Sequence, residues 1–308
     1  MDAQPAECDN QVVWQDLAIR MPAAWEMSRY GLRYERGLCV FADEFRDRLH
    51  LAWQRAVDGP DVERLLSDLK AREQAAPPAN SSGSQAPAFV SLPAIGAWHG
   101  LTISRGDDVT TRAVCNIAPH RLLIEATLLW ERAWDKQLER EILASMHMRD
   151  TSAWRRWQAF GICAEIPAEL ALTECRCLPG DVQWSFQSQG RYPSVSVRRL
   201  GFVRAWLKQP LNRWLEQQIP PGATKVRQGA LHPLASHEVA TIASRRRREG
   251  LGLLTGARIH RHDWAALCPR EQRLYHVATE SRDEAPELVR LACACGSLLP
   301  GMTQGGDP

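Results

Sequence analysis

The amino-acid sequence repeats itself across its two halves. The segment Ile19–Trp25 (IRMPAAW) returns 145 positions later around Glu165–Leu170 (EIPAEL), and the residues that follow each copy run in parallel. Further matches keep the same order: Phe41 with Phe186, Leu49 with Val195, Leu51 with Val197, and Arg121–Thr127 with Arg273–Thr279. Each copy has the length of an ordinary domain. The repeat therefore predicts a tandem duplication, with one unit at 1–150 and a second at 151–308.

The apolar pattern inside each copy predicts strands and a few helices. Leu49, Leu51 and Trp53 occupy alternate positions, which is typical of a strand with one buried face. Single opening strands are expected at Trp14–Ile19 and Trp157–Ile166, and helices at Val62–Glu73, Asp135–Met146, Gly201–Gln217 and Ala285–Cys295. The helix at Gly201–Gln217 is expected to be interrupted or kinked near Pro210. The low-complexity stretch within 75–95 is expected to form a flexible loop of the first unit. This order predicts an α+β fold: two similar units, each a mainly antiparallel sheet with helices packed on it, arranged as a pseudo-dimer.

The same order of elements is shared with a known family. The features concerned are Met21-Pro22-Ala23-Ala24-Trp25, Leu49–Trp53 and Ile142–Met146 in the first copy, and Ile166-Pro167, Leu170 in place of the tryptophan, and Leu288–Cys293 in the second. In these features the chain resembles PsbP-like proteins, which include the extrinsic subunit of photosystem II, a Ran-binding nuclear-import factor, bacterial lipoproteins and chaperones for secreted effectors. The resemblance implies binding, assembly or chaperone work, and it implies no catalytic residues.

Composition and termini indicate the class and setting of the chain. With 44% hydrophobic and 24% charged residues, it has the make-up of a soluble globular protein. It contains no run of 18 apolar residues, so no membrane span is expected. The acidic start Met1–Gln4 leads into no apolar segment, which argues against a secretory signal. Nine cysteines, an odd number spread over a long chain, favour a reduced, cytoplasmic setting.

Cysteines and histidines supply the candidate metal ligands: Cys175, Cys177, Cys293, Cys295, His260 and His262. Thiolates and imidazoles bind zinc and other transition metals, and in a strand a spacing of two places both side chains on one face. Small cysteines buried in a core are the plainer interpretation of the two Cys-x-Cys pairs. A redox disulfide is a third reading. No cofactor is therefore expected by default, and a zinc or other transition-metal site is the alternative.

Two further residue sets suggest contact with a partner. Residues 151–308 hold 21 basic and 14 acidic side chains, a net +7, against 17 and 22 in residues 1–150, a net −5. The candidates for binding anions or nucleic acid are Arg245, Arg246, Arg247, Arg248, Arg258 and Arg261. Few aromatic residues lie near them for base stacking, so a solvated turn is the plainer interpretation. The candidates for a protein-binding surface are Trp206, Trp214 and Trp264.

The common catalytic motifs are missing from the sequence. It contains no P-loop, no dinucleotide-binding glycine motif, no nucleophile elbow and no HExxH pair. We therefore expect a non-enzymatic binding, assembly or chaperone-type protein that acts on another protein through a partner surface or a groove between its two repeated domains. A metal-binding or metal-dependent protein that uses His260, His262 and the Cys-x-Cys pairs is one alternative. Nucleic-acid binding through the arginine-rich second unit is the other.

Overall fold

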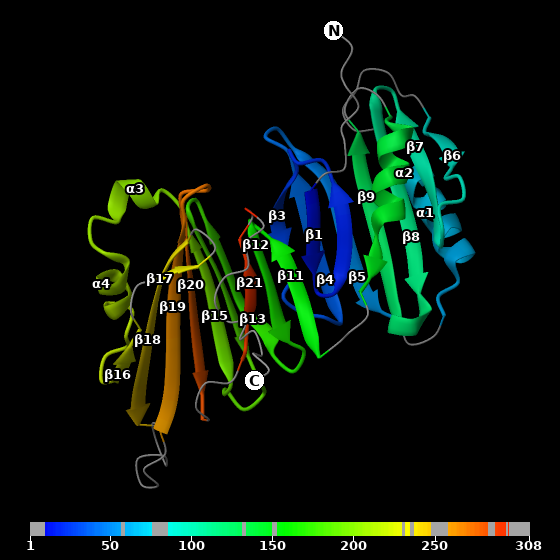
Figure 1. Cartoon of the computed structure of the whole chain (residues 1–308). Coiled ribbons are helices and arrows are strands. Elements are labelled where there is room, and N and C mark those ends of the chain that lie inside the picture. The colour runs from blue at the N-terminus through cyan, green and yellow to red at the C-terminus, as the bar shows by residue number, and fades with distance from the viewer. Residues whose placement is uncertain are drawn as a thin grey trace, which may run out of the picture. The chain divides into compact units, whose positions relative to one another are not determined.

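The computed structural model describes residues 10–56, 59–75, 86–130, 134–149, 153–229, 232–234, 237–247, 258–282, 287–293 and 295. The chain divides into two compact units, Met1–Arg149 and Asp150–Pro308, whose elements are labelled in Figure 1. Of the described residues, 56% lie in strands and 15% in helices. Within the described part of the chain, no helix is long and apolar enough to cross a membrane.

Unit 1 consists of a small sheet, a large sheet and two α-helices. The small sheet has β2 (Leu17–Met21) between β1 (Asn10–Trp14) and β10 (His147–Met148). The large antiparallel sheet runs in the order β3-β4-β5-β9-β8-β7-β6. Its strands are β3 (Glu26–Tyr30), β4 (Arg36–Ala42), β5 (Asp47–Arg55), β6 (Ala88–Ser91), β7 (Trp98–Arg105), β8 (Asp108–Ile117) and β9 (Leu122–Trp130), and the helices are α1 (Val62–Ala75), α2 (Lys136–Ser145) and the 3-10 turn η1 (Ala118–His120).

One face of the large sheet of unit 1 carries its core. A row of cross-strand neighbours runs from Phe41 through Leu49, Leu128 and Thr111 to Thr102, and all five are buried. Cross-strand neighbours share one face, so this row fixes which face points inward. Helix α2 lies on this face and α1 on the other, because α2 bonds to Thr111 whereas α1 packs against alternate positions of β7.

Unit 2 repeats the plan of unit 1. Its small sheet has β12 (Ile162–Pro167) between β11 (Trp154–Ala159) and β21 (Arg290–Ala292). Its large antiparallel sheet runs β13-β14-β15-β20-β19-β18-β16, with β17 also paired to β18. The strands are β13 (Ala171–Leu178), β14 (Asp181–Gln187), β15 (Ser194–Leu200), β16 (Thr224–Gln228), β17 (His232–Leu234), β18 (His237–Arg247), β19 (Arg258–Cys268) and β20 (Arg273–Ser281), and the helices are α3 (Val203–Trp206) and α4 (Leu211–Glu216).

Both faces of the large sheet of unit 2 are covered. On one face Trp157 of β11 packs edge-on against Phe186, with ring centroids 5.2 Å apart, and lies 6.5 Å from Trp184. On the other face α4 buries Leu211, Trp214 and Leu215 in a cluster with Ala240, Ile242, Ala265 and Leu274. Figure 1 shows α4 alongside β18 and β19. Burial of such apolar surface is the main contribution to the stability of both layers.

The two large sheets correspond strand by strand. Phe186 and Val195 face each other across β14 and β15 as Phe41 and Leu49 do across β4 and β5. From there the row in unit 2 continues through Thr279 and His262 to Ala243, the positions of Leu128, Thr111 and Thr102 in unit 1. The chain thus contains two repeated sheet units.

The expected α+β fold class is wrong, because the structure is mostly antiparallel sheet. The expected closing helix at Ala285–Cys295 contains β21 instead. Its buried positions Leu291 and Cys293 alternate with the less buried Arg290 and Ala292, and its backbone pairs with β12. The helix expected at Gly201–Gln217 with an interruption near Pro210 consists of two short pieces, α3 and α4, because Pro210 has no amide hydrogen and stands at the N-cap of α4.

The two expected opening strands are in fact hairpins. Trp14–Ile19 turns at Gln15 and Asp16, which have φ of 52° and 65°, and Trp157–Ile166 turns at Phe160 and Gly161, with φ of 52° and 68°. Positive φ at both central residues is the geometry of a tight two-residue hairpin turn. Of the loop expected within 75–95, residues 76–85 lie outside the described residues, and Ala88–Ser91 form β6.

Candidate functional site

The densest group of potential metal ligands in the described residues lies in unit 2. His237, Cys268, Cys293 and Cys295 each offer one ligand atom, and these atoms all lie within 4.8 Å of one another. His237 begins β18 and Cys268 ends β19, and the pairing of Glu238 with Leu267 brings the two strand ends together. The two remaining cysteines follow β21, whose pairing with β12 holds their segment in place.

The distances from His237 to the two cysteines after β21 match those between ligands of a tetrahedral metal ion. Nε2 of His237 lies 3.3 Å from Sγ of Cys293 and 3.5 Å from Sγ of Cys295. In a zinc site with Zn–S of about 2.3 Å and Zn–N of about 2.0–2.1 Å, a nitrogen and a sulfur ligand are roughly 3.5 Å apart. His237, Cys268 and Cys293 are buried and Cys295 is half-buried. One imidazole and three thiolates form a Cys3His set, which fills all four positions of a tetrahedral structural zinc site.

A second arrangement of the same sulfurs competes with metal binding. Cys293 and Cys295 lie at disulfide distance and are two positions apart in the sequence. A tetrahedral zinc ion needs its sulfur ligands separated by about 3.7 Å and deprotonated. The two cysteines can therefore form a disulfide or bind a metal, but not both at once.

The structure brings only part of the sequence-predicted metal set together. Cys293 and Cys295 lie in the cluster, joined by His237 and Cys268, which sequence reasoning missed. His262 points to the same face of β19 as Cys268 but six residues away, and His260 lies two residues further. Cys175 and Cys177 lie on the edge strand β13, opposite Trp184 and Val182. No spacing motif marks His237 and Cys268, because they meet only through the pairing of β18 with β19.

The arginines of the predicted anion-binding set do not form one basic surface. Arg246 and Arg261 turn toward Glu280, at 3.2 and 3.3 Å. Arg261 also forms a bidentate pair with Asp263, at 2.7 and 2.8 Å. Strand alternation directs Arg245, Arg247 and their pairing partners Arg258 and His260 to the face opposite Arg246. Arg248 lies outside the described residues.

Arg261 belongs to a buried polar network under α4. Nε2 of His276 lies 2.9 Å from the carboxylate of Asp263, and the ring of Trp214 packs edge-on over His276. Burial acts to raise the pKa of Asp263, but hydrogen bonds from His276 and Arg261 outweigh it and lower this pKa below its ordinary value. Every partner of Asp263 is thus a cationic or potentially cationic group, and the carboxylate stays ionised.

The three tryptophans predicted to bind a partner differ in exposure. Trp214 and Trp264 are buried, at 7% and 8% exposure. Trp206 is 37% exposed, and its ring lies 6.1 Å from that of Trp214. Of the three, Trp206 alone presents a large surface to a partner.

Unit 1 buries a carboxyl group in a different environment. Glu139 of α2 accepts hydrogen bonds from the hydroxyl of Thr111 and, at 2.9 Å, from Nε1 of Trp134. Thr111 in turn accepts one from Nε1 of Trp130. Burial raises the pKa of Glu139 above its ordinary value, and the hydrogen bonds from Thr111 and Trp134 oppose this without reversing it. Glu139 also lines a cavity of about 1030 Å³ beside Arg20, Lys136 and Arg140.

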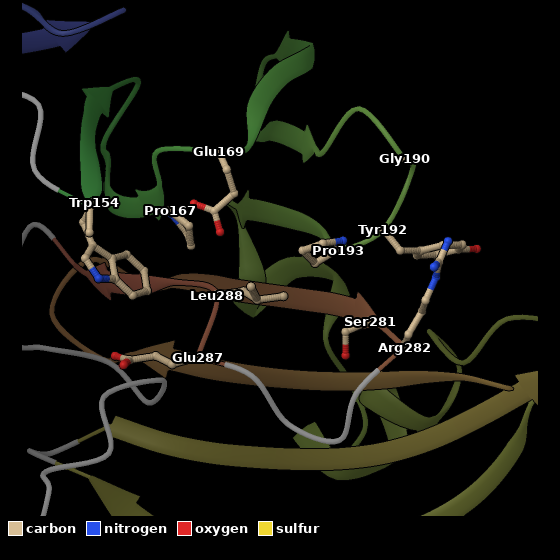
Figure 2. A pocket seen from close by; sticks show the side chains of 11 residues that line it. Trp154, Pro167, Glu169, Gly190, Tyr192, Pro193, Ser281, Arg282, Glu287 and Leu288 are labelled. Carbon is tan, nitrogen blue, oxygen red and sulfur yellow. The ribbon is translucent and has the colours of Figure 1, made fainter.

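A second cavity, of about 590 Å³, opens in unit 2 (Figure 2). It is bounded by Ala153, by Trp154 of β11, by the end of β12 and by the turn at Gly190–Pro193. Ser281, Arg282, Glu287 and Leu288 also line it. In the view of Figure 2, Glu169 lies on the side of Trp154 and Pro167, Arg282 lies beside Tyr192, and Leu288 lies between them.

Comparison with known proteins gives no family for this chain. No family model and no curated protein matches it. Among solved structures, a crystal structure of a protein from Bacteroides thetaiotaomicron VPI-5482 is similar at 13% sequence identity and a TM-score of 0.28. The match covers 47% of this chain and 50% of that protein, and a likeness of this size supports no inference on fold or function.

Proposed function

We propose that this chain is a non-enzymatic, zinc-binding protein whose second unit is held together by a structural zinc ion. The observation that carries the proposal is the convergence of His237, Cys268, Cys293 and Cys295, with all four ligand atoms inside 4.8 Å. Four protein ligands leave no coordination position for a substrate or a reactive water, which separates structural from catalytic zinc sites. The ion would therefore stabilise the unit and take no part in a reaction.

The position of the cluster explains what the ion would do for the fold. Its ligands come from the start of β18, the end of β19 and the segment after β21, which are far apart in the sequence. Such a site forms only once these segments have come together, so the free energy of binding contributes directly to folding. The C-terminal segment gains most, because β21 is only three residues long.

Metal analysis of the full chain, purified under reducing conditions, tests the proposal. We expect about one zinc per chain, and loss of that zinc in His237→Ala and in Cys293→Ser/Cys295→Ser. Cys175→Ser/Cys177→Ser is the matched control, because it removes the other Cys-x-Cys pair of the same unit and should keep the zinc. A reduced, folded protein without metal, or one whose zinc survives the cluster variants, would contradict the proposal.

A disulfide between Cys293 and Cys295 is the second candidate, supported by the short approach of their sulfurs. It would close a short covalent loop within the C-terminal segment, without joining that segment to His237 or Cys268. Titration of thiols in denaturant, without reductant, separates the two: the metal site leaves all nine cysteines as thiols once zinc is chelated, and the disulfide leaves two fewer.

For the wider role of the chain we propose binding or assembly with another protein. The exposed ring of Trp206 supports this role, and the resemblance to PsbP-like proteins would imply the same class of work but stays a prediction. Nucleic-acid binding is less supported, since Arg246 and Arg261 are engaged by Glu280 and Asp263. Capture of a partner by the wild-type chain but not by Trp206→Ala tests the role, and salt-sensitive retention on heparin would favour nucleic acid instead.

A further inference from the structure

The cavity of Figure 2 has the make-up of a ligand site that is separate from the metal cluster. Its walls are Trp154 and Tyr192, and apolar surface comes from Pro167, Pro193 and the buried Leu288. Its volume, about 590 Å³, lies in the range of pockets that enclose small ligands, roughly 300–1,000 Å³. An apolar interior with a few polar groups at the edge is the usual composition of such pockets.

The walls of this cavity are held by bonds within unit 2. The hydroxyl of Tyr192 accepts a hydrogen bond from Nη2 of Arg246 at 3.1 Å, and the carbonyl of Tyr192 accepts one from the hydroxyl of Ser188 at 2.7 Å. The guanidinium of Arg290 lies 4.2 Å from the ring centroid of Trp154 and donates to Glu287 at 2.9 Å. The aromatic walls are therefore fixed before a ligand enters, which lowers the entropic cost of binding.

Two charges at the rim have no ion-pair partner among the described residues. Glu169 and Arg282 are both exposed and both line the cavity, whereas the third charged group, Glu287, is neutralised by Arg290. In Figure 2 the carboxylate of Glu169 and the guanidinium of Arg282 lie on different sides of Leu288. The rim thus offers one acceptor for a cation and one donor for an anion, separated by apolar surface.

We infer that this cavity binds a short apolar peptide of two or three residues with free termini. The ammonium group of the peptide pairs with Glu169, its carboxylate pairs with Arg282, and its side chains lie on Leu288, Pro167 and Pro193 between the two aromatic rings. A charge-assisted hydrogen bond at each end and apolar contact in the middle match the two features that the cavity combines. The inference does not depend on the metal site, so either can fail without the other.

Calorimetric titration of the full chain with tri-leucine tests the inference, with N-acetylated and C-amidated tri-leucine as the capped probes. We expect tri-leucine to bind and each cap to weaken binding about tenfold, since each removes one charge-assisted bond. Glu169→Gln should weaken tri-leucine by a similar factor and leave the acetylated peptide unaffected. Arg282→Gln should weaken binding of free tri-leucine by a similar factor and leave binding of the amidated peptide unaffected.

Matched controls are Glu238→Gln and Arg270→Gln, because both residues are exposed and neither lines the cavity. They should bind tri-leucine as the wild-type chain does. The four substituted side chains all lie at the surface, so none of the variants is expected to unfold. Absence of binding at millimolar peptide overturns the inference. So does binding that ignores both rim substitutions, or that depends on only one end of the peptide.

Discussion

In both units the segment after the last long strand returns to corresponding strands on the same face of the large sheet. In unit 1 it is helix α2, whose Glu139 bonds to Thr111 of β8. In unit 2 it is the segment with Cys293 and Cys295, which meets His237 of β18 and Cys268 of β19. Ala243 of β18 and His262 of β19 occupy the places that Thr102 and Thr111 hold in unit 1. His237 and Cys268 each lie six residues from these positions, so the contact in unit 2 is made at the other end of the two strands. One sheet plan thus carries two different ways of fixing its last segment.

The difference follows from how much surface each segment can bury. Helix α2 has ten residues, a side-chain N-cap from Asp135, and Ile142 and Leu143 at 0% exposure. Its apolar face and its cap hold it without help. The described segment in unit 2 has a three-residue strand and buries little more than Leu288, Val289 and Leu291. A metal ion bound by Cys293 and Cys295 would add to these few apolar contacts, because binding free energy at such a site contributes to folding.

The largest effect is expected on removing the cluster in unit 2. Cys293→Ser/Cys295→Ser should lower the free energy of unfolding of unit 2 by about 4 kcal/mol where the cysteines hold a metal ion, and by only about 1–2 kcal/mol where they form a disulfide, which closes a short loop. Hydrogen exchange measures this locally: exchange should accelerate in β21 and β12 and stay unchanged in α2. The pair Cys175→Ser/Cys177→Ser serves as control. If β21 stayed protected in the cluster variant, apolar contacts alone would fix the segment and the comparison would fail.

The corresponding change in unit 1 is a truncation in α2. Leu143 is fully buried, so Leu143→Ala should cost about 3 kcal/mol through lost apolar contact and the cavity left behind. Exchange should then accelerate in α2 and β10, while β21 keeps its protection. Arg140→Ala, on the same helix, is the control for lost side-chain bulk outside the core. Equal losses of stability in Leu143→Ala and Arg140→Ala would show that α2 is not held by its apolar face.

The fold was predictable from the sequence where local patterns decide it. The alternation at Leu49–Trp53 predicted a strand that is present, the helices expected at Val62–Glu73 and Asp135–Met146 are also present, and the repeat predicted two similar sheet units. The hairpin turn at Gln15-Asp16 was not predictable, because both residues adopt positive φ without the glycine that usually signals such a turn, whereas Gly161 marks the corresponding turn in unit 2. The closing segment of unit 2 was wrongly predicted as a helix. The six residues Leu288–Cys293 are mostly apolar, so their pattern fits the period of a helix as well as that of a strand.

The candidate site was predictable only in its local half. Cys293 and Cys295 stand two apart and could be found as a pair. His237 and Cys268 lie far from them and from each other, and strand pairing alone brings them together. Asp263 and His276 illustrate the same point, since their contact depends on the pairing of β19 with β20. Register between distant strands is a tertiary property that spacing within a strand does not record.

The buried carboxyl groups extend the comparison to pH. The lowered pKa of Asp263 means that its ionised form is favoured by folding, so its contribution is present above the unfolded pKa of about 3.9 and is lost as pH falls through the folded value. Asp263→Asn should cost unit 2 about 2 kcal/mol at pH 7, because Arg261 and His276 lose a charged partner. Urea denaturation of the wild-type and variant chains, followed through hydrogen exchange in β19 and β20, should show this cost shrinking in acid. A cost independent of pH would contradict the ionised state of Asp263.

The smallest effect is expected at Glu139, and its sign is opposite. The raised pKa of Glu139 means that folding favours its protonated form, so its contribution is complete below the unfolded pKa of about 4.3 and is lost as pH rises through the folded value. Glu139→Gln keeps the shape and the acceptor oxygen for Thr111 and Trp134 but removes the ionisation. The stability of wild-type unit 1 should therefore fall between acidic and neutral pH, and that of the variant should not. Denaturation at several pH values, followed through exchange in α2, measures it, with Glu141→Gln as the control for a half-buried carboxyl group on the same helix. A decline that persists in Glu139→Gln would assign the pH dependence to another group. The contrast between the protonated form favoured at Glu139 and the ionised form favoured at Asp263 would then fail.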